Sequence, residues 1–220
     1  MKLHWSPRSP FVRKVMIVLH ETGQLDDVEL VRSVVALSQP PNPELLADNP
    51  LGKIPTLITD EGMALFDSRV ICEYLDQRSN AGLVPSDPGA RMQALRWQAL
   101  GDGLTDMLLL WRTELTRPTG PWQAVTDGWL AKVRACMTQL ENEVSNLRTA
   151  PFGIGHIAIA CALGQLDFRW PDSDWRRQFP KLAALGAEWD GRQSISVTAI
   201  KNDQADDNSL TLGHLSFAPH

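Results

Sequence analysis

The chain has 220 residues, and its composition, 43% hydrophobic and 21% charged, is that of a globular protein large enough to bury a core. The net charge of −5 argues against non-specific binding of nucleic acid, which needs a basic surface. No uninterrupted apolar run approaches the ~20 residues that span a bilayer, and Arg8, Arg13 and Lys14 break any signal-peptide core. We therefore expect a cytoplasmic protein that binds neither nucleic acid nor membranes.

The cysteines and histidines do not indicate a redox or metal centre. Cys72, Cys136 and Cys161 are far apart and fall in helical patterns, so they are expected to be reduced. The five histidines lack metal-ligand spacing, and we expect no metal ion.

The first 80 residues alternate between strand and helix patterns. The first helix begins with Ser9 as N-cap and Pro10 at its first position, and it ends at Gly23. The predicted elements are strands at 2–5, 28–31, 56–58 and 64–66 and helices at 10–22, 43–48 and 68–77. This order predicts a small mixed sheet with helices on it, a thioredoxin-like α/β domain over residues 1–80.

Prolines and glycines between Arg78 and Gly89 predict a linker, which we place at residues 81–89. Beyond it the strand patterns vanish, and we expect an all-α helical bundle over residues 90–220. The expected helices are 90–117, 121–148, 156–169 and 180–191.

An irregular tail is expected from about residue 193. It contains an acidic run at 203–208, followed by Leu210, Leu212, Leu215 and Phe217. Disorder is the expectation for such a segment at a chain end. The alternative is a tail that folds back over a pocket.

One motif stands out in the first domain: Asn49-Pro50-Leu51-Gly52-Lys53-Ile54-Pro55-Thr56-Leu57. Proline has no N–H to pair in a strand interior, so Pro55 should begin a strand, and its peptide bond is a candidate for the cis form. Ile54 would then offer its backbone N–H and C=O to an extended peptide as if to one more strand. An ordinary proline-containing loop is the alternative.

Two helix starts accompany this motif, Ser9-Pro10-Phe11 and Asp67-Ser68. Free backbone N–H groups at a helix start bind anions well. A hydroxyl at such a place can also donate a hydrogen bond to an anion, worth ~1.5–3 kcal/mol. The alternative is that Ser9 is a plain N-cap.

The three segments together, Ser-Pro-Phe-x-Arg-Lys, Asn-Pro-Leu-Gly-Lys-Ile-Pro and Asp-Ser-x-x-Ile-x-x-Tyr-Leu, resemble the glutathione transferase family. The resemblance is to cytosolic members with a serine-type active site, both a bacterial Ser-Pro-Phe-Val-Arg-Lys subset and the plant tau class. It is strong over residues 1–80, looser over residues 88–192 and absent beyond about Ala199.

The resemblance implies that Ser9 activates the thiol of glutathione, which is a substrate here, for attack on a small electrophile. Arg13, one turn beyond Ser9, would raise the local potential; the alternative is that Arg13 is a surface charge. The glutathione-binding residues implied by the resemblance are Phe11, Arg13, Gln39, Lys53, Ile54, Pro55, Asp67 and Ser68. Asp67 and Ser68 would hold the γ-glutamyl end, and Lys53 a carboxylate.

Two features depart from the family pattern. The loop at residues 38–42 carries no basic residue to hold the glycyl carboxylate, and Gln39 is the only substitute. The usual Ser/Thr-x-x-Asp capping box of the sixth helix is replaced by Gly153 and His156.

The acceptor pocket should lie between the domains beside Ser9, with Met107, Trp111 and Arg112 as its wall. Alternatively, Trp111 belongs to the bundle core and Arg112 to the surface. The resemblance also implies a homodimer, with apolar surface supplied by the tryptophan-rich residues 97–111. The function it implies is conjugation of glutathione to a hydrophobic electrophile, and the alternative is a non-catalytic binding module that acts through protein partners.

Overall fold

The computed structural model of the chain describes residues 1–36, 40–203 and 215–217. The N-terminal domain contains a four-stranded mixed sheet in the order β2-β1-β3-β4. Strand β1 (Lys2–Trp5) pairs in parallel with β2 (Glu29–Arg32) and antiparallel with β3 (Thr56–Ile58), which pairs antiparallel with β4 (Ala64–Leu65).

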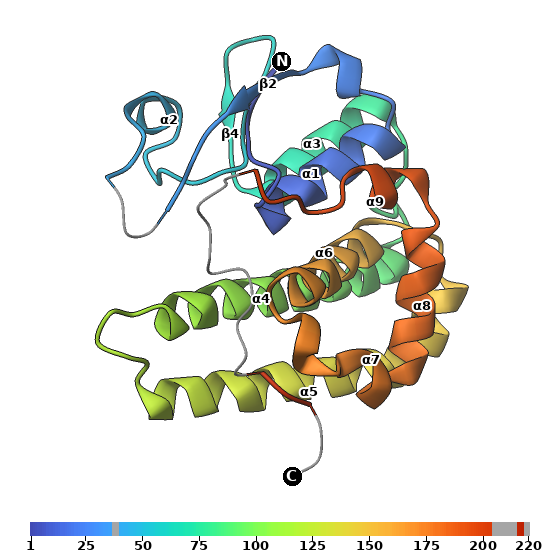
Figure 1. Cartoon of the computed structure of the whole chain (residues 1–220). Coiled ribbons are helices and arrows are strands. Elements are labelled where there is room, and N and C mark those ends of the chain that lie inside the picture. Colours follow the sequence, from blue (N-terminus) through green and yellow to red (C-terminus); the bar gives the residue numbers. More distant parts are fainter. Residues whose placement is uncertain (37–39, 204–214, 218–220) are drawn as a thin grey trace.

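Three helices cover this sheet. Helices α1 (Pro10–Glu21) and α3 (Ser68–Ser79) pack side by side on one side of it, and α2 (Pro43–Asp48) lies on the other (Figure 1). A short 3₁₀ turn, η1 (Leu25–Asp27), connects α1 to β2.

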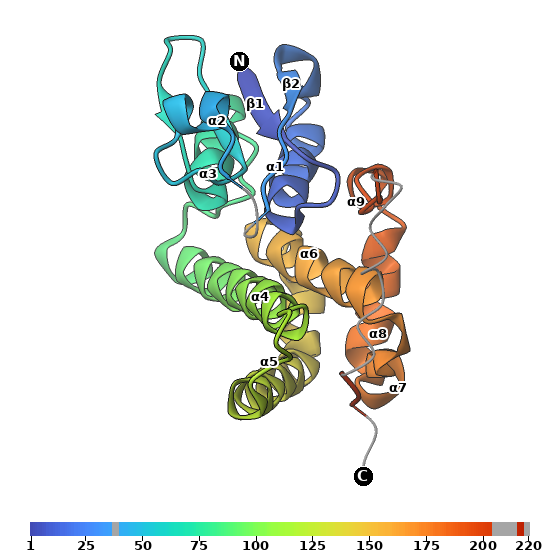
Figure 2. The same ribbon diagram turned by 60° about the vertical axis from the view of Figure 1, so that its left-hand side comes forward.

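The rest of the described chain is helical. Helices α4 (Pro88–Leu115) and α5 (Gln123–Thr149) form a long antiparallel pair, and α6 (Ile154–Arg169) lies between α4 and the N-terminal domain (Figure 2). The chain continues through η2 (Pro171–Ser173), α7 (Trp175–Gln178), α8 (Pro180–Asp190) and α9 (Gln193–Val197), which returns to α1.

Helix α6 forms the centre of the helical region because it is apolar on nearly all sides, as expected of a fully enclosed helix. Its backbone packs closely on α4 at Gly101, where an added Cβ would lie 2.6 Å from the carbonyl carbon of Ala158. The side chains of α6 fill the space between α4, α1 and α8. This close packing fixes α1, which carries Ser9, relative to α4.

The predicted fold class is confirmed, a thioredoxin-like α/β domain followed by a helical region. Two short helices were not predicted, α7 and α9, and α9 falls in the stretch that was expected to be irregular from residue 193. Helices of four and five residues are too short to show a helical period in the sequence.

The expectation of a disordered tail is wrong for its last described residues. Leu215 and Phe217 are 3% and 4% exposed. The Phe217 N–H donates to the Ser173 carbonyl at 3.0 Å, and its ring meets Phe179 edge-on at 5.3 Å. Most of the predicted acidic run, together with Leu210 and Leu212, lies outside the described residues.

The replaced capping box at α6 is partly restored by an imidazole. The Gly153 N–H donates to Nδ1 of His156 at 3.1 Å, and Nε2 donates to the Leu147 carbonyl at 2.9 Å. Burial lowers the pKa of His156, which keeps the ring neutral so that one nitrogen can accept and the other donate. The imidazole therefore caps the helix start as the usual carboxylate would.

Candidate functional site

The strand register brings the three sequence motifs to one edge of the sheet. His4, near the end of β1, pairs with Thr56 at the start of β3, and Leu57 pairs with Leu65 at the end of β4. The segments that lead into α1, into β3 and into α3 therefore lie at the same end of the strands, which we call the sheet edge.

Ser9 is the N-cap of α1, as predicted. It has an extended backbone, its hydroxyl accepts from the Val12 N–H at 3.3 Å, and it is partly exposed at the sheet edge. The hydroxyl donates no hydrogen bond to another described residue. Phe11 follows half-buried, with the Lys14 ammonium 6.0 Å from its ring centre.

The segment before β3 is held by the side chain of Asn49, which is 1% exposed. Its Nδ2 donates to the Lys53 carbonyl at 3.1 Å and to Thr56 Oγ1 at 2.9 Å, and its Oδ1 accepts from the Leu51 N–H at 2.9 Å. The Ile54–Pro55 peptide bond is cis, as predicted. No hydrogen bond joins the Ile54 backbone to any other described residue, so its N–H and C=O are available to a ligand.

At the start of α3, Asp67 is the N-cap and accepts from the Arg69 N–H at 2.9 Å. Asp67 is exposed, whereas Ser68 is 2% exposed and lies within the first turn. The open N–H groups at this helix start and the exposed Asp67 carboxylate can hold an ammonium and a carboxylate of one ligand. Lys53 is exposed near the same edge.

An ion cluster behind these segments was not predicted. The Lys14 ammonium lies 2.8 Å from both carboxylate oxygens of Asp102, and Arg69 Nε donates to the same carboxylate at 2.9 Å. Asp102 on α4 thereby joins α1, which begins at the Ser9 cap, to α3, which begins at the Asp67 cap. Desolvation and the neighbouring Asp102 raise the pKa of Asp106, one turn further along α4, while Arg69 and Lys53 oppose the rise.

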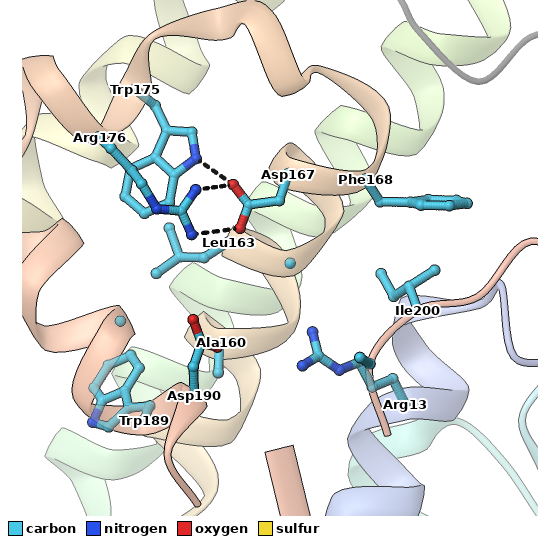
Figure 3. Close-up of a pocket in the computed structure, with 13 residues that line it drawn as sticks. Arg13, Ala160, Leu163, Asp167, Phe168, Trp175, Arg176, Trp189, Asp190 and Ile200 are labelled. Carbon is cyan, nitrogen blue, oxygen red and sulfur yellow. Dashed lines mark hydrogen bonds and ion pairs between the residues drawn. The ribbon is translucent and has the colours of Figure 1, made fainter. Parts of the chain in front are cut away.

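The structure does not place Arg13 with the other predicted glutathione residues. Arg13 is 7% exposed, and its side chain turns toward the helical region (Figure 3), where Nη2 donates to the Ile195 carbonyl at 3.2 Å. Ser9 and Arg13 are four residues apart and lie on the same face of α1, but the long arginine side chain extends away from the sheet edge. We therefore do not keep Arg13 in the site. Gln39 lies outside the described residues.

The predicted acceptor wall is also corrected in part. Trp111 is 1% exposed and packs on Trp170 with ring centres 5.9 Å apart, which places it in the bundle core. Met107 is half-buried and packs against the same core, and Arg112 is half-buried on the next turn. The alternative that Trp111 is a core residue is thus what the structure shows.

The two buried cysteines, Cys72 and Cys161, do not supply a nucleophile. Burial raises the pKa of Cys72 to about 12 and that of Cys161 to about 11, so neither thiol ionises at neutral pH. Among the described residues, no group of three His, Cys, Asp or Glu side chains is arranged to hold a metal ion. No helix in the described ranges is both long and apolar enough to cross a bilayer.

Two family models match the chain. The model described as "Glutathione S-transferase, N-terminal domain" matches residues 8–78, and "Glutathione S-transferase, C-terminal domain" matches residues 123–185. The first match includes all three motifs of the sheet edge.

Similar proteins extend over nearly the whole chain. An "Uncharacterized GST-like protein YibF" from Escherichia coli K12 is 34% identical over 206 residues, which cover 90% of this chain and 98% of that protein. A glutathione transferase family member from Pseudomonas fluorescens Pf-5, crystallised with bound glutathione, is 44% identical with a TM-score of 0.87 and covers 91% of this chain and 99% of its own. The same protein was also crystallised with S-(propanoic acid)-glutathione.

A more distant similarity points to a different kind of protein. Elongation factor 1-gamma from Carassius auratus is 27% identical over 155 residues, which cover 64% of this chain but only 32% of that protein.

Proposed function

The chain belongs to the glutathione S-transferase family, and we propose that it is a glutathione transferase whose Ser9 activates the glutathione thiol for attack on a small hydrophobic electrophile. The observation that supports this most directly is the sheet edge itself. A capped helix start with a free hydroxyl proton, an unpaired strand-like backbone at Ile54 and a second helix start at Asp67 emerge there together. The P. fluorescens relative, which shares 44% of its residues, was crystallised with glutathione.

Three parts of glutathione, the cysteinyl backbone, the γ-glutamyl end and the thiol, find partners in this arrangement. The cysteinyl backbone pairs with the N–H and C=O of Ile54, which extends the sheet by one short strand. The γ-glutamyl carboxylate binds the N–H groups at the start of α3, and its ammonium lies by Asp67. The thiol then lies beside Ser9, where a free thiol of pKa ~8.5 is shifted toward the thiolate by the hydroxyl donor and the helix start.

Binding of glutathione is the first result to test. We expect Asp67→Asn to weaken glutathione binding about tenfold, because the ligand's ammonium loses a charged partner while the N-cap is retained. Isothermal titration calorimetry measures this directly. Glu61→Gln, an exposed carboxylate in the β3–β4 turn, is the matched control and should bind as the wild type does. Equal affinity of wild type and Asp67→Asn would remove Asp67 from the site.

The competing proposal is a non-catalytic module that acts through protein partners, which the similarity to elongation factor 1-gamma favours. Such a module needs neither a free hydroxyl at Ser9 nor an open Ile54 backbone. Retention on immobilised glutathione, release by free glutathione and turnover of an aryl halide would together favour the enzyme. Binding without turnover of any electrophile would favour the module.

We also propose a two-fold homodimer in which α3 of one subunit packs on α4 of the other. The prediction that tryptophans of residues 97–111 supply the apolar contact surface is wrong, because Trp97 and Trp111 are only 3% and 1% exposed within one subunit. Exposed apolar residues on the two helices take their place: Val70 on α3 is 47% exposed and Met92 on α4 is 68% exposed. We expect sedimentation equilibrium to give twice the chain mass, and Val70→Glu with Met92→Glu to shift it to the monomer. A wild-type monomer at micromolar concentration would exclude the dimer.

A further inference from the structure

The imidazole of His4 joins parts of the N-terminal domain that are far apart in the sequence. His4 is 2% exposed and belongs to β1, an interior strand of the sheet. Its Nδ1 lies 2.8 Å from Oγ of Ser33, just after β2, and its Nε2 lies 2.7 Å from Oδ2 of Asp48, the last residue of α2. A carboxylate only accepts hydrogen bonds, so Nε2 carries a hydrogen and donates it to Asp48. Hydrogen bonds from His4 and from Lys2 lower the pKa of Asp48, which is therefore charged at neutral pH.

A serine, a histidine and an aspartate also make up the catalytic triad of many hydrolases, but this cluster does not act as one. Ser33 is 1% exposed and His4 is 2% exposed, so a substrate cannot reach the serine hydroxyl. The cluster therefore acts through the element to which Asp48 belongs, helix α2.

Helix α2 depends on this contact for its position. It lies on the side of the sheet opposite to α1 and α3 (Figure 1), and of its six residues, all of them described, only Leu45 is buried. Asp48 also accepts from Nζ of Lys2 at 2.7 Å, but the side chains of that pair are 28% and 37% exposed, and exposed pairs contribute little. The enclosed hydrogen bond from His4 is therefore the polar contact that fixes the end of α2 against the sheet.

The end of α2 leads directly into the segment that carries Ile54. Asp48 precedes Asn49, whose side chain holds this segment through the Lys53 carbonyl. A Cβ added to Gly52 would lie 3.3 Å from Cδ2 of Leu46, so the turn before Ile54 also packs on the side of α2. A displacement of α2 would therefore displace the Ile54 backbone.

We propose that His4 is a positioning residue for the glutathione site, which fixes α2 through Asp48 and thereby fixes the turn that presents the Ile54 backbone. This inference rests on the proposed function, because that backbone is the part assigned to the cysteinyl group of glutathione. A segment that is ordered in advance costs less to immobilise when its ligand binds. His4 thus contributes to glutathione affinity without contacting glutathione, whereas the thiol step depends on Ser9 in another segment.

Replacement of His4 with leucine is expected to weaken glutathione binding about tenfold, because the ligand must then order the turn itself. Turnover at saturating glutathione should stay within about twofold of the wild type, since the lost contribution is the same in the ground state and in the transition state. His4→Gln, whose amide N–H takes the place of the Nε2 hydrogen, should restore most of the affinity. Ser33→Ala is the matched control, because it removes the 2.8 Å contact to the other ring nitrogen and leaves the link to α2 intact. Wild-type affinity in His4→Leu, or an equal loss in Ser33→Ala, would overturn the inference.

A second pair of variants decides the matter if His4→Leu does not fold. The Asp48 side chain is 28% exposed, so its replacement disturbs the interior less. Asp48→Ala should weaken glutathione binding as His4→Leu does, and Asp48→Asn, whose amide oxygen still accepts from Nε2, should bind nearly as the wild type does.

Hydrogen–deuterium exchange without glutathione tests the positioning directly. The N–H groups of Leu51 and Gly52 each donate to Asn49 at 2.9 Å, and they should exchange faster in Asp48→Ala than in Asp48→Asn. Equal exchange in the two variants would overturn the role of His4 while glutathione binding by the wild type upheld the proposed function. A wild type that binds no glutathione would instead overturn the proposed function and the inference that rests on it.

Discussion

Replacing Ser9 with alanine is expected to lower turnover with a general aryl halide electrophile by about one to three orders of magnitude, with little change in glutathione affinity. Loss of one donor to a developing anion has this scale. The hydroxyl proton has no acceptor among the described residues, so it is available to the thiolate. Initial rates at saturating glutathione, beside the dissociation constant from calorimetry, separate the two effects.

The pH profile gives an independent readout of the same change. A hydrogen bond worth ~1.5–3 kcal/mol to the thiolate corresponds to a lowering of the thiol pKa by about 1–2 units. In the wild type the rate should therefore level off near neutral pH. In Ser9→Ala the pKa of the bound thiol rises, so the rate should continue to climb through pH ~8.5.

Helix capping must be separated from thiol activation, because Ser9→Ala also removes the N-cap of α1, at a cost of ~1 kcal/mol. Asp87→Ala is the matched control: Asp87 caps α4 with a 2.8 Å hydrogen bond to the Ala90 N–H and is not part of the site. It should lose similar stability and keep its turnover. Ser9→Thr keeps both cap and hydroxyl and should retain most activity. Wild-type turnover in Ser9→Ala would remove Ser9 from the mechanism.

Local patterns predicted the parts of this protein that depend on short stretches of chain. Pro43 after the N-cap Asn42 marks the start of α2, and the predicted range 43–48 matches the helix found. The cis bond before Pro55 follows from a proline placed at a strand start. Both features depend on neighbouring residues only, so the local sequence is enough to predict them.

Features that depend on distant packing were missed. The spacing of Ser9 and Arg13 predicts a shared helix face, but it does not say that α6 and α9 would lie beside α1 and receive the guanidinium. Lys14 gives no sign of burial in sequence, because its partner is 88 residues away. One signal was present: Asp102 falls among the apolar positions of α4, close to Leu104 and Leu108, where a charge requires a partner.

Replacing Asp102 with alanine is expected to destabilise the protein by ~3–5 kcal/mol, the largest stability effect we expect from a single carboxylate. The Lys14 and Asp102 side chains are 1% and 3% exposed, and the Lys14 ammonium meets both carboxylate oxygens at 2.8 Å. Removal of one partner leaves an enclosed charge without compensation. Arg69 loses the same partner but is 51% exposed, so water can replace that contact. The midpoint and slope of urea unfolding measure the change.

Whether the unpaired Lys14 ammonium causes the loss of stability in Asp102→Ala can be tested by removing both charges. The double variant Lys14→Met with Asp102→Leu replaces the pair by apolar side chains of similar length, and such replacements of buried pairs are often neutral. It should therefore recover most of the stability that Asp102→Ala loses. The exposed pair Arg148–Glu188, with side chains 48% and 53% exposed, supplies the control: Glu188→Ala should cost no more than ~1 kcal/mol. If Asp102→Ala cost as little as Glu188→Ala, the ammonium of Lys14 would have to reach water in solution, and the junction of α1, α3 and α4 would depend on apolar packing alone.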